Sequence, residues 1–266
     1  MPVDKNNNLV INELQKKIYY IYYDLGIPFE ININGIKVEK GKGHEIISNY
    51  IIINPFLIKE DNSITLSINH KNISPELIDQ IKIELYVGDI VHKEDVELIK
   101  TINFSEDITQ KIANKMSTTF NFDPDIYYES NYLNDAMDLS NDNLRENLLI
   151  EVLDFYNEIH DIIDSGDYKE YLKKYEKSNA REMNSMYYDT NEKENYLNKL
   201  SSRVVSSKGF MQPLDKYHLS INQNNKIISL EHEKYASPLY SIDSLDKIKT
   251  YGMMLYKSSD GKLKIY

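Results

Sequence analysis

The ten residues "FEININGIKV", from Phe29 to Val38, restrict the fold more than any other part of the chain. Apolar and polar residues alternate on both sides of the pair Asn34-Gly35. A two-residue hairpin turn needs positive φ at both central positions, and Asn-Gly adopts such angles most readily. Alternation with a period of two buries one face of each flanking strand. The stretch therefore predicts an antiparallel β-hairpin that belongs to a half-buried sheet.

Other strand-like segments surround this hairpin between residues 16 and 122. They are rich in β-branched and aromatic residues, which favour strands, and they include "KKIYYIYYDLG", "NYIIINPFLI", "ITLSI", "IKIELYV", "VELIKTINF" and "STTFNF". Pro55 disfavours a central position in a sheet and indicates an edge or a bend. Seven or eight strands at short spacing predict an antiparallel β-sandwich domain over residues 16–122.

The pattern changes after residue 122. Residues 123–142 are polar, acidic and without hydrophobic period, so we expect an acidic linker. Beyond it, apolar residues recur every three or four positions, and a Glu follows three residues after each of Asn143, Asp167 and Asn191, as in a capping box. Three helices are predicted. Strand-like segments follow, so residues 143–266 are expected to form an α+β domain in which a curved antiparallel sheet follows the helices.

The order of three helices and then strands ending in "GMMLYKSSDGKLKIY" resembles the nuclear-transport-factor-2-like, or SnoaL-like, cone over roughly residues 143–266. That resemblance implies a curved sheet around a cavity, used by some members as enzymes and by others as binding modules. A β-sandwich joined to an acidic α+β domain is also similar to some bacterial immunity proteins. This second resemblance implies a protein partner, namely a toxin delivered by a competing cell.

Negative charge is concentrated in the middle of the chain. The net charge is −11, and fourteen acidic residues between Asp123 and Glu170 are opposed only by Arg145 and Lys169. Such a field repels nucleic acid and attracts a basic protein. The candidate partner-binding residues combine acids with tyrosines as anchors, and they are Tyr127, Tyr128, Tyr132, Glu151, Asp154, Glu158 and Asp161. A solvated acidic face without any partner is the alternative.

The sequence contains no arrangement that specifies a reaction. There is no cysteine, and no Gly-x-Ser-x-Gly nucleophile elbow is present. His160 is offset on a helix from Glu158 and Asp161, which lie three residues apart, so a shared metal is geometrically poor. We therefore expect no catalytic residue, no metal and no cofactor.

Two further histidines lie in predicted strands. His218 shares its strand face with Lys216 and Ser220 and is expected to face solvent. His232 shares its face with hydrophobic residues and could point into a concave cavity. There it would serve as an acid or base, or as a structural histidine.

These observations favour a non-enzymatic binding protein, most concretely an immunity protein that neutralises a bacterial toxin by direct binding. A toxin with a basic surface would match the acidic surface of this chain. One alternative is a SnoaL-like enzyme or small-molecule-binding module that uses the C-terminal cavity. Another is a surface module that binds glycan or peptide through the tyrosines of "IYYIYYD". No apolar run is long enough to span a membrane. We expect a cytoplasmic protein, or a periplasmic one if a leader has been removed.

Overall fold

The computed structural model describes residues 16–43, 46–69, 80–88, 96–104, 108–112, 115–128, 132–141 and 145–266. The chain divides into two compact units. The first unit comprises residues 1–130 together with 185–187, and the second comprises residues 131–184 and 188–266. Each unit is described by itself.

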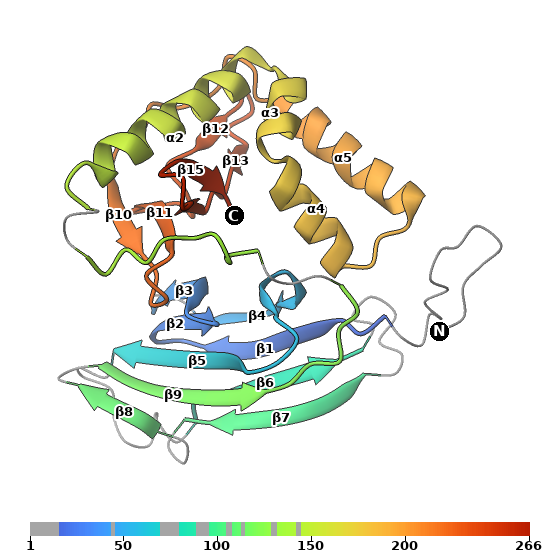
Figure 1. The fold of residues 1–266 in the computed structure, drawn as a ribbon, viewed down its shortest axis with the longest axis vertical. Coiled ribbons are helices and arrows are strands. Elements are labelled where there is room, and N and C mark those ends of the chain that lie inside the picture. The colour runs from blue at the N-terminus through green and yellow to red at the C-terminus, as the bar shows by residue number, and fades with distance from the viewer. Residues whose placement is uncertain are drawn as a thin grey trace. The chain divides into compact units, whose positions relative to one another are not determined.

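The first unit consists of antiparallel strands in two sheets (Figure 1). One sheet has the order β4-β1-β6-β7 and the other has the order β3-β2-β5-β9-β8. The strands are β1 (Tyr19–Leu25), β2 (Pro28–Ile33), β3 (Ile36–Lys42), β4 (Ile47–Ile52), β5 (Asn62–Asn69), β6 (Lys82–Val87), β7 (Glu97–Asn103), β8 (Ile108–Ile112) and β9 (Lys115–Phe122). β8 is a strand that the sequence pattern did not indicate.

The predicted hairpin is confirmed. β2 pairs with β3 so that Ile33 faces Ile36, and the turn residues have positive φ, 52° at Asn34 and 71° at Gly35. The inward-facing residues of both sheets share one hydrophobic core, in which Ile31 of β2 and Ile21 of β1 are fully buried. Pro55 lies in a short 3-10 helix, η2 (Asn54–Phe56), which confirms the predicted bend.

The first residues of the expected linker pack against the first unit. Ile126 and Tyr128 belong to its hydrophobic core. The Tyr128 hydroxyl donates to the backbone carbonyl of Asn54 over 2.6 Å, and Lys17 forms an ion pair with Asp125 at 2.9 Å. Residues 123–128 are therefore part of the first unit, although their composition is that of a linker.

The second unit contains four helices and six strands among its described residues (Figure 1). The helices are α2 (Leu148–Ser165), α3 (Tyr168–Lys174), α4 (Glu176–Ser185, whose last residue belongs to the first unit) and α5 (Thr190–Val205). The strands are β10 (Tyr217–Ile221), β11 (Ile227–His232), β12 (Tyr240–Ile242), β13 (Ile248–Thr250), β14 (Leu255–Lys257) and β15 (Leu263–Ile265). They form an antiparallel sheet of order β10-β11-β14-β15 and a separate pair, β12-β13.

The helix boundaries differ in part from the predicted ones. Asp167 caps α3 as predicted, since its side chain accepts from the N–H of Glu170. The cap predicted at Asn191 is wrong: Asp189 forms a full capping box with Glu192, two residues earlier. The segment predicted as one second helix is divided at Tyr175, where α3 ends. Asn143, the predicted cap of the first helix, lies outside the described residues.

Buried Tyr156 joins α2 to the strands of its unit. The apolar residues of α2, including Val152 and Ile159, are fully buried at helical spacing, as the sequence pattern predicts. The Tyr156 hydroxyl donates to the carbonyl of Met253 and accepts from the N–H of Leu230, each over 2.9 Å. One hydroxyl therefore satisfies two backbone groups that have no access to water.

We predict that Tyr156→Phe lowers the free energy of unfolding by about 2–4 kcal/mol, because the carbonyl of Met253 and the N–H of Leu230 lose their partner. Tyr175→Phe is the matched control. The Tyr175 hydroxyl is buried next to Tyr171 and has no hydrogen-bond partner of good geometry among the described residues, so we expect a change within about 1 kcal/mol. Urea denaturation measures both values, and equal losses would contradict this account.

Alkaline pH should unfold the protein. Burial raises the pKa of Tyr23 and of Tyr187 to about 12, and Glu39 adds to the effect at Tyr23. A raised folded-state pKa means that the folded state holds the proton more tightly, so stability is complete below the unfolded pKa of about 10 and falls as pH rises from 10 to 12. Absorbance at 295 nm should show one group of the 22 tyrosines ionising near pH 10 and a second group ionising only with loss of the folded CD signal. Ionisation of every tyrosine near pH 10 in the folded state would disprove this.

Candidate functional site

The exposed side of α2 carries a line of apolar and acidic residues that we call the α2 outer stripe: Ile150, Asp154, Asn157 and Asp161. All four are exposed, and their spacing of four, three and four residues places them on one helix face. Ile150 is 61% exposed, and its neighbour Leu149 is exposed as well. The face opposite contains Tyr156 and the buried apolar residues, so the core fixes which side of α2 meets solvent.

Two of the four predicted acidic residues are neutralised inside the second unit. Glu151 pairs with Lys257 at 2.7 Å, and Glu158 pairs with Lys174. Among the described residues, Asp161 contacts only the ring of the neighbouring His160, at 3.0 Å. No ion pair of Asp154 occurs among the described residues. Of the four predicted acids, Asp154 and Asp161 are therefore the two without a lysine partner among the described residues.

The three predicted tyrosine anchors lie in different surroundings. Tyr127 is 45% exposed, and Tyr132 is half-buried. Tyr128 is only 7% exposed, and its hydroxyl is bonded to the backbone of Asn54, so it packs in the core and cannot anchor a partner at the surface. Tyr127 and Tyr128 belong to the first unit, whereas Tyr132 belongs to the second with the acidic residues.

His232 bonds to the backbone of its own turn through one ring nitrogen, while its Nε2 is buried without a hydrogen-bond partner among the described residues. It is buried, and its Nδ1 accepts from the N–H groups of Lys234 and Tyr235, each over 2.9 Å. The neutral ring must therefore carry its proton on Nε2, which lies 3.7 Å from Asp215. The ring also stacks on Tyr235, with centroids 5.0 Å apart. A general base needs a ring nitrogen with a free lone pair. The lone pair of Nδ1 is taken up by the two backbone N–H groups.

His218 faces solvent, as the sequence predicts. His218 is exposed, with Glu231 3.7 Å away. His160 contacts Asp161, and no group of three potential metal ligands occurs in the part of the chain that the structure describes. Among those residues, no helix is long and apolar enough to cross a membrane.

Apolar side chains form one buried cluster between α2 and the strands of the second unit. Met253 and Leu255 are buried in one hydrophobic cluster with Leu230, on β11, and Tyr156. Packing of this kind leaves the apolar atoms in contact with one another.

The first unit carries an aromatic group on the outer face of the sheet β4-β1-β6-β7. The rings of Tyr20 and Tyr86 stack with centroids 5.4 Å apart and an interplanar angle of 13°, and Tyr50 meets Tyr20 edge-on at 6.1 Å. Tyr50 is 52% exposed, and Leu98, which faces Tyr86 on β7, is exposed too. Alternation along β1 could have revealed this group, because Tyr20 lies opposite to the inward-facing Ile21.

Comparison of the chain with known protein families, with curated proteins and with solved structures found no match.

The acceptor nitrogen of His232 is expected to contribute to stability in addition to the packing of its ring. We predict that His232→Leu lowers the free energy of unfolding by about 1–3 kcal/mol, since two N–H groups lose their acceptor. His232→Asn places an oxygen near the position of Nδ1 and should recover a large part of that loss. Thermal unfolding of the two variants tests this, and equal destabilisation by Asn and Leu would show that the acceptor is unimportant.

Proposed function

We propose that this chain is a non-enzymatic protein-binding protein, and specifically an immunity protein that neutralises a basic toxin by covering it. The observation that carries the proposal is the α2 outer stripe. It places exposed Ile150 on the same helix face as Asp154 and Asp161, the two predicted acids that pair with no lysine among the described residues. The proposal also includes the architecture expected from the sequence, namely a β-sandwich domain followed by a cone-like α+β domain.

In an interface of this composition, the charged residues mainly set the association rate and the apolar residue mainly sets the dissociation rate. Uncompensated carboxylates steer a basic partner and raise the association rate, and their effect weakens with salt. An apolar side chain that becomes fully buried contributes mainly to a slow dissociation rate. Glu151 and Glu158 contribute less to steering, because Lys257 and Lys174 cancel their charge at a distance.

A surface module that binds peptide or glycan is the second candidate, and the tyrosine group of the first unit favours it. Tyr50 offers an exposed ring beside the stacked pair Tyr20 and Tyr86. The stacked rings cover each other, however, and this reduces the flat surface open to a sugar. A SnoaL-like enzyme has less support, because the Nδ1 of His232 is occupied and Met253 and Leu255 are packed in the core.

The binding test uses the protein encoded by the gene immediately upstream as the ligand, captured for surface plasmon resonance. We predict that Asp154→Lys combined with Asp161→Lys lowers the association rate constant about tenfold or more at low salt, and that the difference shrinks at 0.5 M salt. The matched control is Glu194→Lys combined with Glu233→Lys, which reverses two exposed charges elsewhere in the same unit. Equal association rate constants for the two double variants would show that the α2 outer stripe is not part of the interface.

A single apolar change tests the other half of the proposal. Ile150→Ser should raise the dissociation rate constant about tenfold while the association rate constant stays within about twofold, because the side chain is uncharged and acts only after contact. The variant should be as stable as the wild type, since Ile150 is exposed. An unchanged dissociation rate would show that Ile150 is outside the interface.

A further inference from the structure

The second unit contains a pocket that no part of the proposed function uses. It has a volume of about 300 Å³ and lies between α4, the segment before α2 and the C-terminal strands. Its walls are formed by Tyr132, Asn134, Asp135, Lys177, Ser178, Arg181, Tyr256, Ile265 and Tyr266. This size is at the lower end of the range for small-molecule sites.

The unusual residue of this pocket is Arg181. It is only 7% exposed, yet among the described residues its guanidinium has no ion pair, and its Nε is buried without a hydrogen-bond partner. A buried cation is normally paired, because leaving it unpaired costs several kcal/mol. The nearest acid in sequence, Glu182, attracts Arg181 but does not come within ion-pair distance of it, and burial, the larger influence, raises the pKa of the Glu182 carboxyl group.

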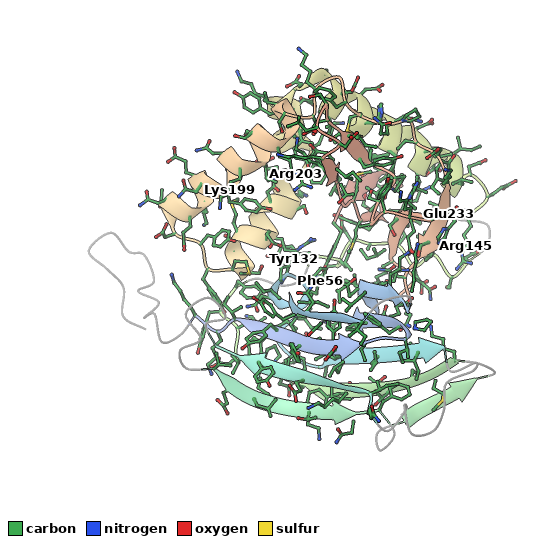
Figure 2. The ribbon with its side chains drawn as sticks, turned by 180° about the vertical axis from the view of Figure 1, so that it is seen from behind. Phe56, Tyr132, Arg145, Lys199, Arg203 and Glu233 are labelled. Carbon is green, nitrogen blue, oxygen red and sulfur yellow. The ribbon has the colours of Figure 1, made fainter. Side chains whose placement is uncertain are left out.

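Aromatic rings determine how a ligand can reach Arg181. The Cζ atom lies 3.6 Å from the centroid of the Tyr266 ring and 5.8 Å from that of Tyr132, which is labelled in Figure 2. A ring stacked on the guanidinium face leaves the edge of the guanidinium, where the N–H bonds lie, for an acceptor. Two coplanar carboxylate oxygens match that edge.

The other charges of the pocket favour an anion with a single negative charge. Lys177, one helical turn before Arg181 on α4, adds a second cation. Asp135 forms an ion pair with Lys264 at 3.0 Å, which lowers the pKa of Asp135 and keeps it ionised. An ionised Asp135 inside the pocket opposes a dianion such as phosphate more strongly than a carboxylate, and the tyrosine walls suit a planar apolar body.

From this geometry we infer that the pocket is a binding site for a small planar organic carboxylate, which places its carboxylate on the edge of Arg181. Lys177 assists from the rim, and Tyr132 and Tyr256 hold the apolar part. This site lies apart from the α2 outer stripe, so it is independent of the proposed toxin-binding function.

Isothermal titration of the full chain with benzoate and its neutral isostere benzamide tests the inference without a mutation. Benzoate should bind at least about tenfold more tightly than benzamide, since only benzoate forms charge-assisted hydrogen bonds with Arg181. Equal binding of the two would overturn the inference. So would the absence of saturable benzoate binding up to about 20 mM, because a ligand of this size in a matched pocket should bind more tightly. Tighter binding of inorganic phosphate than of benzoate would contradict the assignment to a carboxylate.

Variants locate the site. Arg181→Met keeps much of the apolar volume and should weaken benzoate binding about tenfold or more, and a CD spectrum checks that the variant folds. Lys177→Gln, at an exposed position, should weaken binding about threefold without affecting the fold. The control Lys173→Gln changes an exposed lysine on α3 that pairs with Glu170, and it should leave benzoate binding unchanged. Equal effects of Lys177→Gln and Lys173→Gln would place the bound benzoate elsewhere.

Discussion

The packing of the second unit depends on one requirement, that buried backbone groups have hydrogen-bond partners. The carbonyl of Met253 and the N–H of Leu230 come from two segments of the C-terminal half, and the hydroxyl of Tyr156 serves both. No apolar side chain at this position could do so. These two hydrogen bonds fix how α2 is rotated about its own axis relative to the strands. The buried face of the helix then determines that Ile150, Asp154 and Asp161 point to solvent.

The charged residues of this unit are of two kinds: some have an ion-pair partner inside the unit, and others have none among the described residues. Glu151, Glu158 and Asp135 have lysine partners inside the unit, so their charges are largely cancelled at a distance. Asp154 and Arg181 have no ion pair among the described residues. An external ion of opposite charge would gain most at these two residues, and the two proposals, a basic protein surface at Asp154 and a small anion at Arg181, rest on this difference.

Sequence reasoning succeeded where the determining interactions are local. The Asn34-Gly35 hairpin follows from two residues and their neighbours, and the buried face of α2 follows from a period of 3.6. It failed where partners are distant in the chain: Glu151 meets Lys257 across 106 residues, and Tyr128 is buried because it meets Asn54 across 74. A composition rich in acids shows how much charge there is but not which part of it is paired. Arg181 was missed for the same reason, since only the folded structure shows that its guanidinium is buried against tyrosine rings and has no ion pair among the described residues.

The central claim is that this protein meets its partner through the exposed face of α2. Carboxyl footprinting with mass spectrometry, carried out with and without the protein encoded upstream, measures this directly. The account predicts that Asp154 and Asp161 react several-fold more slowly in the complex, while Glu194 and Glu233 react as in the free protein. Unchanged reactivity of Asp154 and Asp161 in a complex that has formed would contradict it.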